Sequence, residues 1–173
     1  MKLSFLRGAI AALVVSVSLS GCAPLAAAPA ETTFVIVRHA EKATNEPKDP
    51  PLSETGHARA LRLAERLVDA HVSAIYATGY RRTQQTASPT ALAHRLEVLT
   101  YDAAMPAKDF AARLRATHAT GTVLVVGHSN TVSAIAAALC GCEIAPLGED
   151  EYDRWIAIRA DRNGATTLEE GRY

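Results

Sequence analysis

The chain has no excess of charge of either sign, because its 173 residues include 18 lysines and arginines and 18 aspartates and glutamates. Nucleic-acid-binding proteins usually carry a basic surface, so this balance argues against a nucleic-acid partner. The sequence also lacks an internal repeat, a low-complexity run and, after its first 31 residues, a second long hydrophobic run. It has no compact metal-ligand spacing such as H-E-x-x-H. We expect no metal and no other cofactor.

The first residues have the composition of an export signal. Two basic residues precede an uncharged apolar run at residues 8–19, which has the length of a secretory signal and is too short to span a membrane. The run ends in LSGC, which resembles a bacterial lipoprotein signal. This resemblance implies cleavage before Cys22 and lipid attachment to that cysteine. The alternative is an ordinary signal peptide that is cut near Ala30.

The lipoprotein interpretation divides the chain into a signal peptide (1–21), an Ala/Pro tether (22–31) and one folded domain (32–173). The last part is long enough for one hydrophobic core and too short for two ordinary domains. We therefore expect an exported protein that its lipid anchors at the periplasmic face of the bacterial envelope. Ala23 is not the aspartate often linked to inner-membrane retention, which favours the outer membrane. The sequence does not set the oligomeric state.

Lipid attachment to Cys22 would leave Cys140 and Cys142 as the remaining cysteines. Export permits a disulfide. A bridge across one intervening residue closes a very small ring, however, and cysteine also behaves as a small buried hydrophobe. We therefore expect structural or loosely redox-active thiols at these two positions.

From Thr33 onward, short β-rich runs alternate with helical stretches, which is typical of βαβ units and a mostly parallel sheet. The expected strands are 33–37, 74–77, 97–100 and 122–126, the expected later helices follow Arg81, Ala107 and Asn130, and the Asn163-Gly164 turn predicts a closing hairpin. The predicted fold is a three-layer α/β domain. Helices flank its mostly parallel sheet, and the hairpin forms its C-terminal edge.

The first helix has its own start signal and apolar stripe. Ser53 can cap a helix that runs over about 54–70. Leu61, Ala64 and Val68 recur at helical spacing, so we expect them on the buried face.

Two apolar strands each end at a histidine. TFVIVRHAEK delivers Arg38 and His39, and TVLVVGHSN delivers His128. Ligands of open α/β sheets bind at the carboxyl ends of parallel strands, so these side chains can meet in one pocket. Between them lies Arg82 in RRTQQTA. Since the planar fork of arginine matches phosphate oxygens and stays protonated, the pattern indicates phosphate chemistry.

The motifs VRHAEK, RRTQQTA and GHSNT, in this order, resemble the histidine phosphatase superfamily, the phosphoglycerate-mutase-like group. The likeness covers about residues 34–138. It implies that His39 attacks phosphorus, that the phosphoryl group moves to the imidazole, and that water then releases phosphate. Arg38, Arg82 and His128 match the other residues of the family's phosphate pocket.

The chemistry of the residues agrees with this assignment. In-line phosphoryl transfer needs a nucleophile and cations that cover the equatorial oxygens. The attacking nitrogen of His39 must be unprotonated, so its other nitrogen should donate to a carbonyl or a carboxylate. His128, at the start of the helix after its strand, can act as a protonated donor to phosphate. Asn45 stands where many relatives have a phosphate-contacting asparagine.

The sequence departs from the family pattern at two points. Ala40 follows the Arg-His pair where many relatives have glycine. Relatives commonly take the acid that protonates the leaving oxygen from a segment between the second and third motifs, which here is the short LTYDAAMPAKDF. We expect Asp102 to be this acid because it follows a predicted strand. Glu41 is the alternative, and Asp109 is expected on an exposed helix.

The predicted function is hydrolysis of a small phosphorylated substrate, a phosphomonoester or a phosphohistidine. A non-catalytic phosphate-binding lipoprotein would keep the arginines and lack an effective acid. A serine hydrolase would use Ser129, but Thr131 replaces the last glycine of its motif and no histidine follows His128 to complete the required order. A metal hydrolase would use His39, Glu41 and His128.

Overall fold

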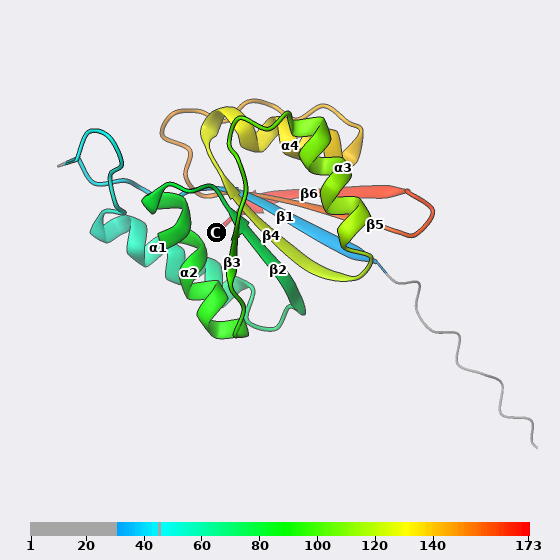
Figure 1. The fold of residues 1–173 in the computed structure, drawn as a ribbon, viewed down its shortest axis with the longest axis horizontal. Helices are drawn as coiled ribbons and strands as arrows, with labels where there is room; N and C mark the ends of the chain where they lie inside the picture. The colour runs from blue at the N-terminus through cyan, green and yellow to red at the C-terminus, as the bar shows by residue number, and fades with distance from the viewer. Residues whose placement is uncertain (1–30, 45) are drawn as a thin grey trace, which may run out of the picture.

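The computed structural model describes residues 31–44 and 46–173, whose fold is drawn in Figure 1. The predicted signal peptide, the predicted lipidation site Cys22, the tether up to residue 30 and Asn45 lie outside the described residues. Their assignments remain predictions.

The described residues form one six-stranded sheet with the order β3-β2-β4-β1-β5-β6. Its strands are β1 (Thr32–Arg38), β2 (Val72–Ala77), β3 (Val98–Thr100), β4 (Gly121–Gly127), β5 (Arg154–Ala160) and β6 (Thr166–Arg172). β1 pairs in parallel with β4, and β2 pairs in parallel with β4 and β3. β5 and β6 continue the sheet in antiparallel fashion. The predicted mostly parallel sheet with a C-terminal edge hairpin is confirmed.

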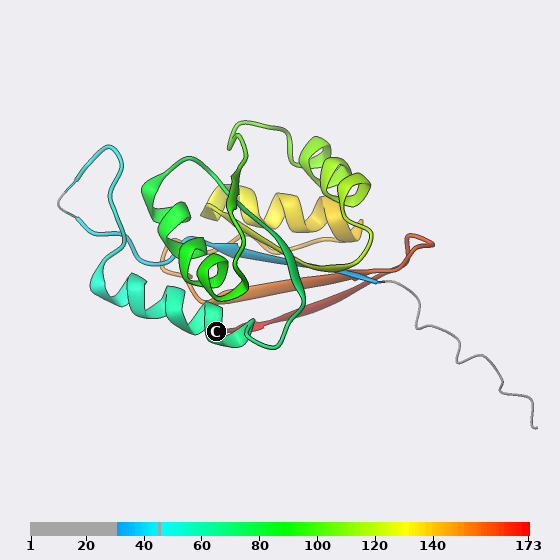
Figure 2. The ribbon, with the colours of Figure 1, turned by 60° about the horizontal axis from the view of Figure 1, so that its bottom comes forward.

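Helices cover both faces of the sheet (Figures 1 and 2). α1 (Glu54–Arg66) and α2 (Arg81–His94) pack together on one face, and α3 (Ala107–Thr117) and α4 (Ser129–Cys140) pack together on the other. The predicted three-layer arrangement is therefore confirmed. In the part of the chain that the structure describes, no helix combines the length and the apolar character needed to cross a membrane.

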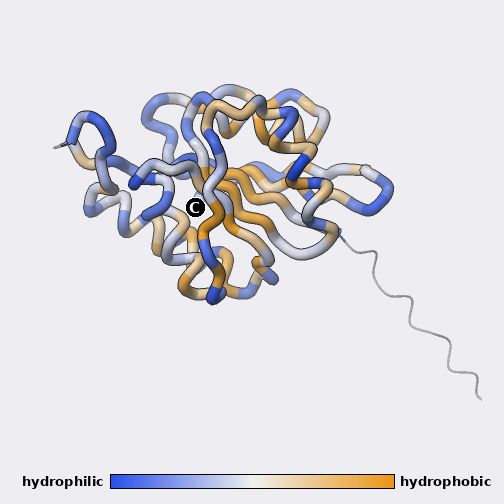
Figure 3. Tube along the Cα trace, in the orientation of Figure 1, coloured by the Kyte–Doolittle hydropathy of each residue, from blue (hydrophilic) through white to orange (hydrophobic). Residues whose placement is uncertain are grey.

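The central strand β1 is buried on both of its faces, which explains its almost continuous apolar sequence. Phe34 and Ile36 belong to the core cluster on the α3 and α4 side, whereas Val35 and Val37 belong to the cluster on the α1 and α2 side. Figure 3 shows this hydrophobic centre as the orange stretch along the middle strands. The apolar run ends at Arg38, the last residue of β1, at the carboxyl end of the parallel strands.

The buried stripe of α1 differs from the predicted one. Leu61 and Val68 are 56% and 61% exposed, whereas Ala60, Leu63 and Leu67 are buried. Both sets recur at intervals of three and four residues, so the periodicity alone was compatible with two faces. The helix also ends at Arg66, earlier than expected.

A close backbone contact sets the rotation of α1. A Cβ atom on Gly56 would lie 2.2 Å from the carbonyl oxygen of Glu41, so only glycine permits this approach. Ser53 caps the helix as predicted, because its Oγ accepts the Gly56 N–H at 3.1 Å. The Ser53 backbone N–H donates to the same Glu41 oxygen at 2.9 Å. The first turn of α1 thereby holds the segment that follows His39.

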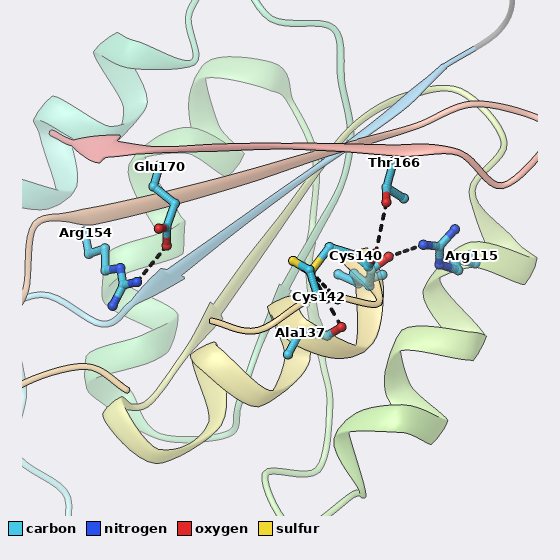
Figure 4. Close-up of a disulfide and its surroundings, with 8 residues drawn as sticks. Arg115, Ala137, Cys140, Cys142, Arg154, Thr166 and Glu170 are labelled. Carbon is cyan, nitrogen blue, oxygen red and sulfur yellow. Dashed lines mark hydrogen bonds and ion pairs between the residues drawn. A yellow bond between two sulfur atoms is a disulfide. The ribbon is translucent and has the colours of Figure 1, made fainter. Parts of the chain in front are cut away.

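Cys140 and Cys142 form a disulfide at the end of α4 (Figure 4), so the prediction of two thiols is wrong. Gly141 ends the helix with φ of 67°, a left-handed conformation that favours glycine. This turn brings the two cysteine Cα atoms to 5.2 Å, a usual separation for a disulfide. The Cys140 carbonyl oxygen also accepts a hydrogen bond from Thr166 Oγ1 of β6 at 3.0 Å.

Leu63→Ala and Leu61→Ala form a matched test of the buried face of α1. Leu63 is fully buried, so its truncation should lower the free energy of unfolding by about 2–5 kcal/mol. The exposed Leu61 should change it by about 0.5 kcal/mol or less. Urea unfolding of both variants measures the difference, and equal losses would contradict the observed face.

Candidate active site

The adjacent strands β1 and β4 bring the two strand-end histidines together. Arg38 at the end of β1 pairs with Gly127 at the end of β4. The backbone N–H of His39 donates to the Gly127 carbonyl oxygen at 2.9 Å, and His128 follows as the N-cap of α4. The two imidazole centroids are 5.4 Å apart. The strand-end pattern in the sequence predicted this juxtaposition.

His39 is held in one tautomer. The residue is 4% exposed, and its Nδ1 lies 2.8 Å from the Ala40 carbonyl oxygen. A carbonyl only accepts hydrogen bonds, so Nδ1 carries the proton and Nε2 of the neutral ring keeps its lone pair. The Ala40 N–H in turn donates to Thr86 Oγ1 at 3.0 Å. The ring therefore presents an unprotonated nitrogen, as attack on phosphorus requires.

The pKa values of both histidines are lowered. Burial lowers the pKa of His39 to about 3, against the raising effect of its hydrogen bond to Ala40, and the charges of Arg82 and Arg38 add to the lowering. Burial and then the same two arginines lower the pKa of His128 to about 4. His128 is thus neutral at pH 7, which differs from the protonated donor that we expected. A bound phosphoryl dianion would favour its charged form.

Arg38 is buried beneath the segment that follows α4. Its Nη1 donates to the carbonyl oxygens of Gly148 and Glu149 at 3.0 and 2.6 Å. Its guanidinium carbon lies 4.1 Å from the centre of the Tyr152 ring. Among the described residues, the buried Nε–H of Arg38 has no hydrogen-bond partner. Leaving such a donor unpaired costs about 1–3 kcal/mol, so a ligand oxygen at this position would be stabilising.

Arg82 approaches the histidines from the first turn of α2. Its guanidinium carbon lies 4.3 Å from the centre of the Tyr80 ring, and its Nη1 lies 3.7 Å from Asp49 Oδ1. The Nε–H of Arg82 is also buried, and nothing in residues 31–44 or 46–173 accepts its hydrogen bond. The two arginines therefore each leave one buried donor for a ligand.

One cavity of about 320 Å³ joins these groups. Arg38, His39, Arg82 and His128 all line it, together with Lys42 and the first turn of α4. The cationic side chains and the N-terminal end of α4 favour an anion. The arrangement can hold a phosphoryl group between cationic donors and a neutral imidazole nitrogen, which is the combination that in-line phosphoryl transfer needs.

The carboxylic acids considered from the sequence lie outside this cavity. Asp102 is exposed and lines a neighbouring cavity. It begins a tight turn after β3, in which its Oδ1 accepts a hydrogen bond from the Ala104 N–H at 2.8 Å. Glu41 is bonded to Arg59 with a closest distance of 2.6 Å. Burial alone would raise the pKa of Glu41. The hydrogen bonds from Arg59 and the charge of Arg59 outweigh burial, so the pKa of Glu41 is lowered. Asp109 is exposed in the first turn of α3, as expected.

Sequence reasoning missed several residues around the cavity. Lys42 stands in the same motif as His39, and Tyr80 directly precedes RRTQQTA, so their positions beside these motifs could have identified both as cavity residues. Glu149 and Tyr152 come from a segment that follows no parallel strand, and only the tertiary structure places them at the site.

NMR titration of the histidine rings tests the electrostatics of the site. With folded-state pKa values of about 3 and 4, His39 and His128 should remain neutral at pH 5.5, whereas in the urea-unfolded chain they should be mostly protonated. The unfolded chain then binds more protons, so the free energy of unfolding should fall as pH decreases from about 6.5 toward 4. Rings that titrate near pH 6.5 in the folded protein would contradict this account.

Residues 34–105 match the histidine phosphatase superfamily (branch 1). The chain is also 39% identical, over 75 residues, to phosphoserine phosphatase 1 of Hydrogenobacter thermophilus. These residues make up 40% of this chain and 36% of that enzyme, so the match spans little more than a third of the relative's length.

Solved structures share the fold. The protein histidine phosphatase SixA complexed with tungstate has a TM-score of 0.65 at 19% identity, over 81% of this chain and 96% of that one. A mycobacterial glucosyl-3-phosphoglycerate phosphatase has a TM-score of 0.64 at 17% identity, over 80% and 97% of the two chains. The structural likeness concerns the fold, and the sequence match includes Arg38, His39 and Arg82. The sequence match to the histidine phosphatase superfamily thus covers residues 34–105, and the likeness in fold extends over about 80% of the chain.

Proposed function

We propose that the protein hydrolyses a phosphomonoester or a phosphohistidine through a phosphohistidine intermediate on His39. The state of His39 carries this proposal. Its imidazole is buried and neutral, and its Nδ1–H donates a hydrogen bond to the Ala40 carbonyl oxygen. The lone pair of Nε2 is therefore available for attack. Arg38 and Arg82 line the same cavity and have unpaired Nε–H groups within the described residues. The similar proteins reported above are named as phosphatases, which supports the same activity.

The reaction takes two steps. In the first step, Nε2 of His39 forms a bond to phosphorus, the bond from phosphorus to the leaving oxygen breaks, and that oxygen takes up a proton. In the second step, water gives up a proton and attacks phosphorus, the phosphorus–nitrogen bond breaks, and phosphate leaves. Arg38 and Arg82 donate to the equatorial oxygens, where negative charge accumulates in both steps.

The short connection between β3 and α3 bears on the substrate. Only residues 101–106 separate these elements, so few side chains from this segment can stand over the cavity and select the leaving group. We therefore propose an accessible phosphorylated group, such as a phosphorylated sugar or protein of the envelope. Phosphoserine and protein histidine phosphate are within this range, and enzymes named for them are among the relatives.

One alternative has an observation in its favour. Because Asp102 lies outside the cavity, a protein that binds phosphate without hydrolysing it would look similar. The serine hydrolase alternative has less support: Ser129 lines the cavity, but its hydroxyl makes no hydrogen bond to a histidine in the described part of the chain. Within residues 31–44 and 46–173 there is also no group of three or more His, Cys, Asp or Glu side chains placed to hold a metal ion.

The proposed location rests on the sequence alone. Residues 8–22 support export and lipid attachment at Cys22. A lipid anchor would hold the catalytic domain at the periplasmic face of the envelope, with the outer membrane favoured over the inner one.

His39→Ala should abolish hydrolysis of p-nitrophenyl phosphate by the purified full-length protein. Removal of the nucleophile should lower kcat by roughly 1000-fold or more. His57→Ala, which removes an exposed histidine of α1, is the control and should retain wild-type kcat within about twofold. Full activity in His39→Ala would sink the covalent mechanism. Phosphate binding by a wild-type protein that turns over no substrate would favour the binding-protein alternative.

Cys22→Ala should prevent incorporation of a labelled fatty acid in cells that express the full chain, because the thiol is the proposed attachment point. Cys142→Ala is the control and should still be labelled, since Cys142 belongs to the folded domain. Undiminished labelling of Cys22→Ala would remove the lipoprotein proposal.

A further inference from the structure

We propose that Glu149 protonates the leaving oxygen and, as the resulting carboxylate, takes a proton from the attacking water. The inference rests on the proposed phosphatase function. It assigns the acid to the segment after α4, in place of Asp102 in the segment after β3.

Glu149 has the position that this role requires. Among the described residues that line the site cavity, it is the one carboxylic acid. Its Oε2 lies 3.8 Å from Nη2 of Arg38, the guanidinium group that would contact a phosphoryl oxygen. A carboxyl group here is beside the bound phosphoryl group without being a partner of His39.

The main chain of Glu149 is fixed, whereas its side chain is free. Nη1 of Arg38 donates to the backbone carbonyl oxygens of Gly148 and Glu149. The Gly148 N–H donates to Oε2 of Glu151 at 3.2 Å and closes the turn. The Glu149 side chain is nevertheless 87% exposed. It can therefore follow leaving groups of different shape while its backbone remains attached to the site.

Among the described residues, the nearby carboxylates accept hydrogen bonds, whereas the Glu149 carboxylate accepts none and has only its long ion pair with Arg38. Glu151 accepts the Gly148 N–H and lies within 3.9 Å of Arg154, and Asp49 accepts the Arg81 N–H at 3.0 Å. The 3.8 Å separation between Glu149 and Arg38 is longer than a hydrogen bond. A phosphoryl dianion bound at Arg38 would compete for that charge, which would release the Glu149 carboxyl group to face the leaving oxygen.

The proton balance closes over the two steps. As Nε2 of His39 bonds to phosphorus and the ester bond breaks, the carboxyl proton of Glu149 moves to the leaving oxygen. As water then bonds to phosphorus and the phosphorus–nitrogen bond breaks, the Glu149 carboxylate takes the water proton. Both side chains return to their starting forms, and no co-reactant is needed.

The test compares two leaving groups in full-length Glu149→Gln. Departure of an alkoxide needs a proton, whereas departure of p-nitrophenolate does not. The variant should lose about 100-fold in kcat on glycerol 2-phosphate, a usual size for general acid catalysis. On p-nitrophenyl phosphate its first-step rate, measured as the burst of p-nitrophenolate, should change less than about threefold. Asp150→Asn, which removes the exposed neighbouring carboxylate, should match wild type on both substrates.

The outcomes separate this inference from the function on which it rests. Equal losses of rate on the two substrates in Glu149→Gln, or no loss on either, would overturn the role of Glu149. The phosphatase proposal would still stand if the wild-type protein hydrolyses the substrates and needs His39 to do so. A wild-type protein that hydrolyses neither substrate, or a His39→Ala variant as active as wild type, would overturn both.

Discussion

The parallel pairing of β1 with β4 determines where the groups of the site lie. Its register sets Arg38 opposite Gly127, so the next residues, His39 and His128, leave the sheet side by side. A shift by one residue would turn the side chains of β1 to the opposite face, and the alternating burial of Phe34 and Val35 in different core clusters opposes such a shift. The apolar core and the site thus depend on the same register.

The charges of the site are held so that a ligand can use them. Carbonyl oxygens and the Tyr152 ring hold Arg38, and the Tyr80 ring covers the guanidinium of Arg82. Among the residues that the structure describes, the closest carboxylates approach these two arginines only to 3.8 and 3.7 Å. A tightly bonded carboxylate would neutralise each arginine, whereas carbonyl groups and aromatic faces orient it and leave its charge available. Burial at the same time lowers the pKa of His39, so its imidazole stays neutral.

Local patterns in the sequence predicted the strands and their polar ends, because strand periodicity and the residue after a strand depend on neighbours in the chain. The face of α1 could not be chosen this way, since two stripes have helical spacing and the contact of Gly56 with Glu41 selects one. The disulfide could not be predicted from the spacing of the cysteines either, because it depends on the left-handed turn at Gly141. The strand before Asp102 predicts that this residue is the acid, yet a tight turn directs its carboxylate to the backbone N–H of Ala104. Glu149 lines the cavity from a segment whose carbonyl groups bind Arg38, a contact between residues that are far apart in the sequence.

The central claim is that His39 becomes phosphorylated during turnover. A single-turnover reaction with a ³²P-labelled phosphomonoester, quenched within milliseconds and followed by peptide mapping, tests this claim most directly. The account predicts a transient, acid-labile phosphate on the peptide that contains His39, which disappears as inorganic phosphate forms. Label on another residue, or release of phosphate with no phosphoenzyme at any time, would contradict it.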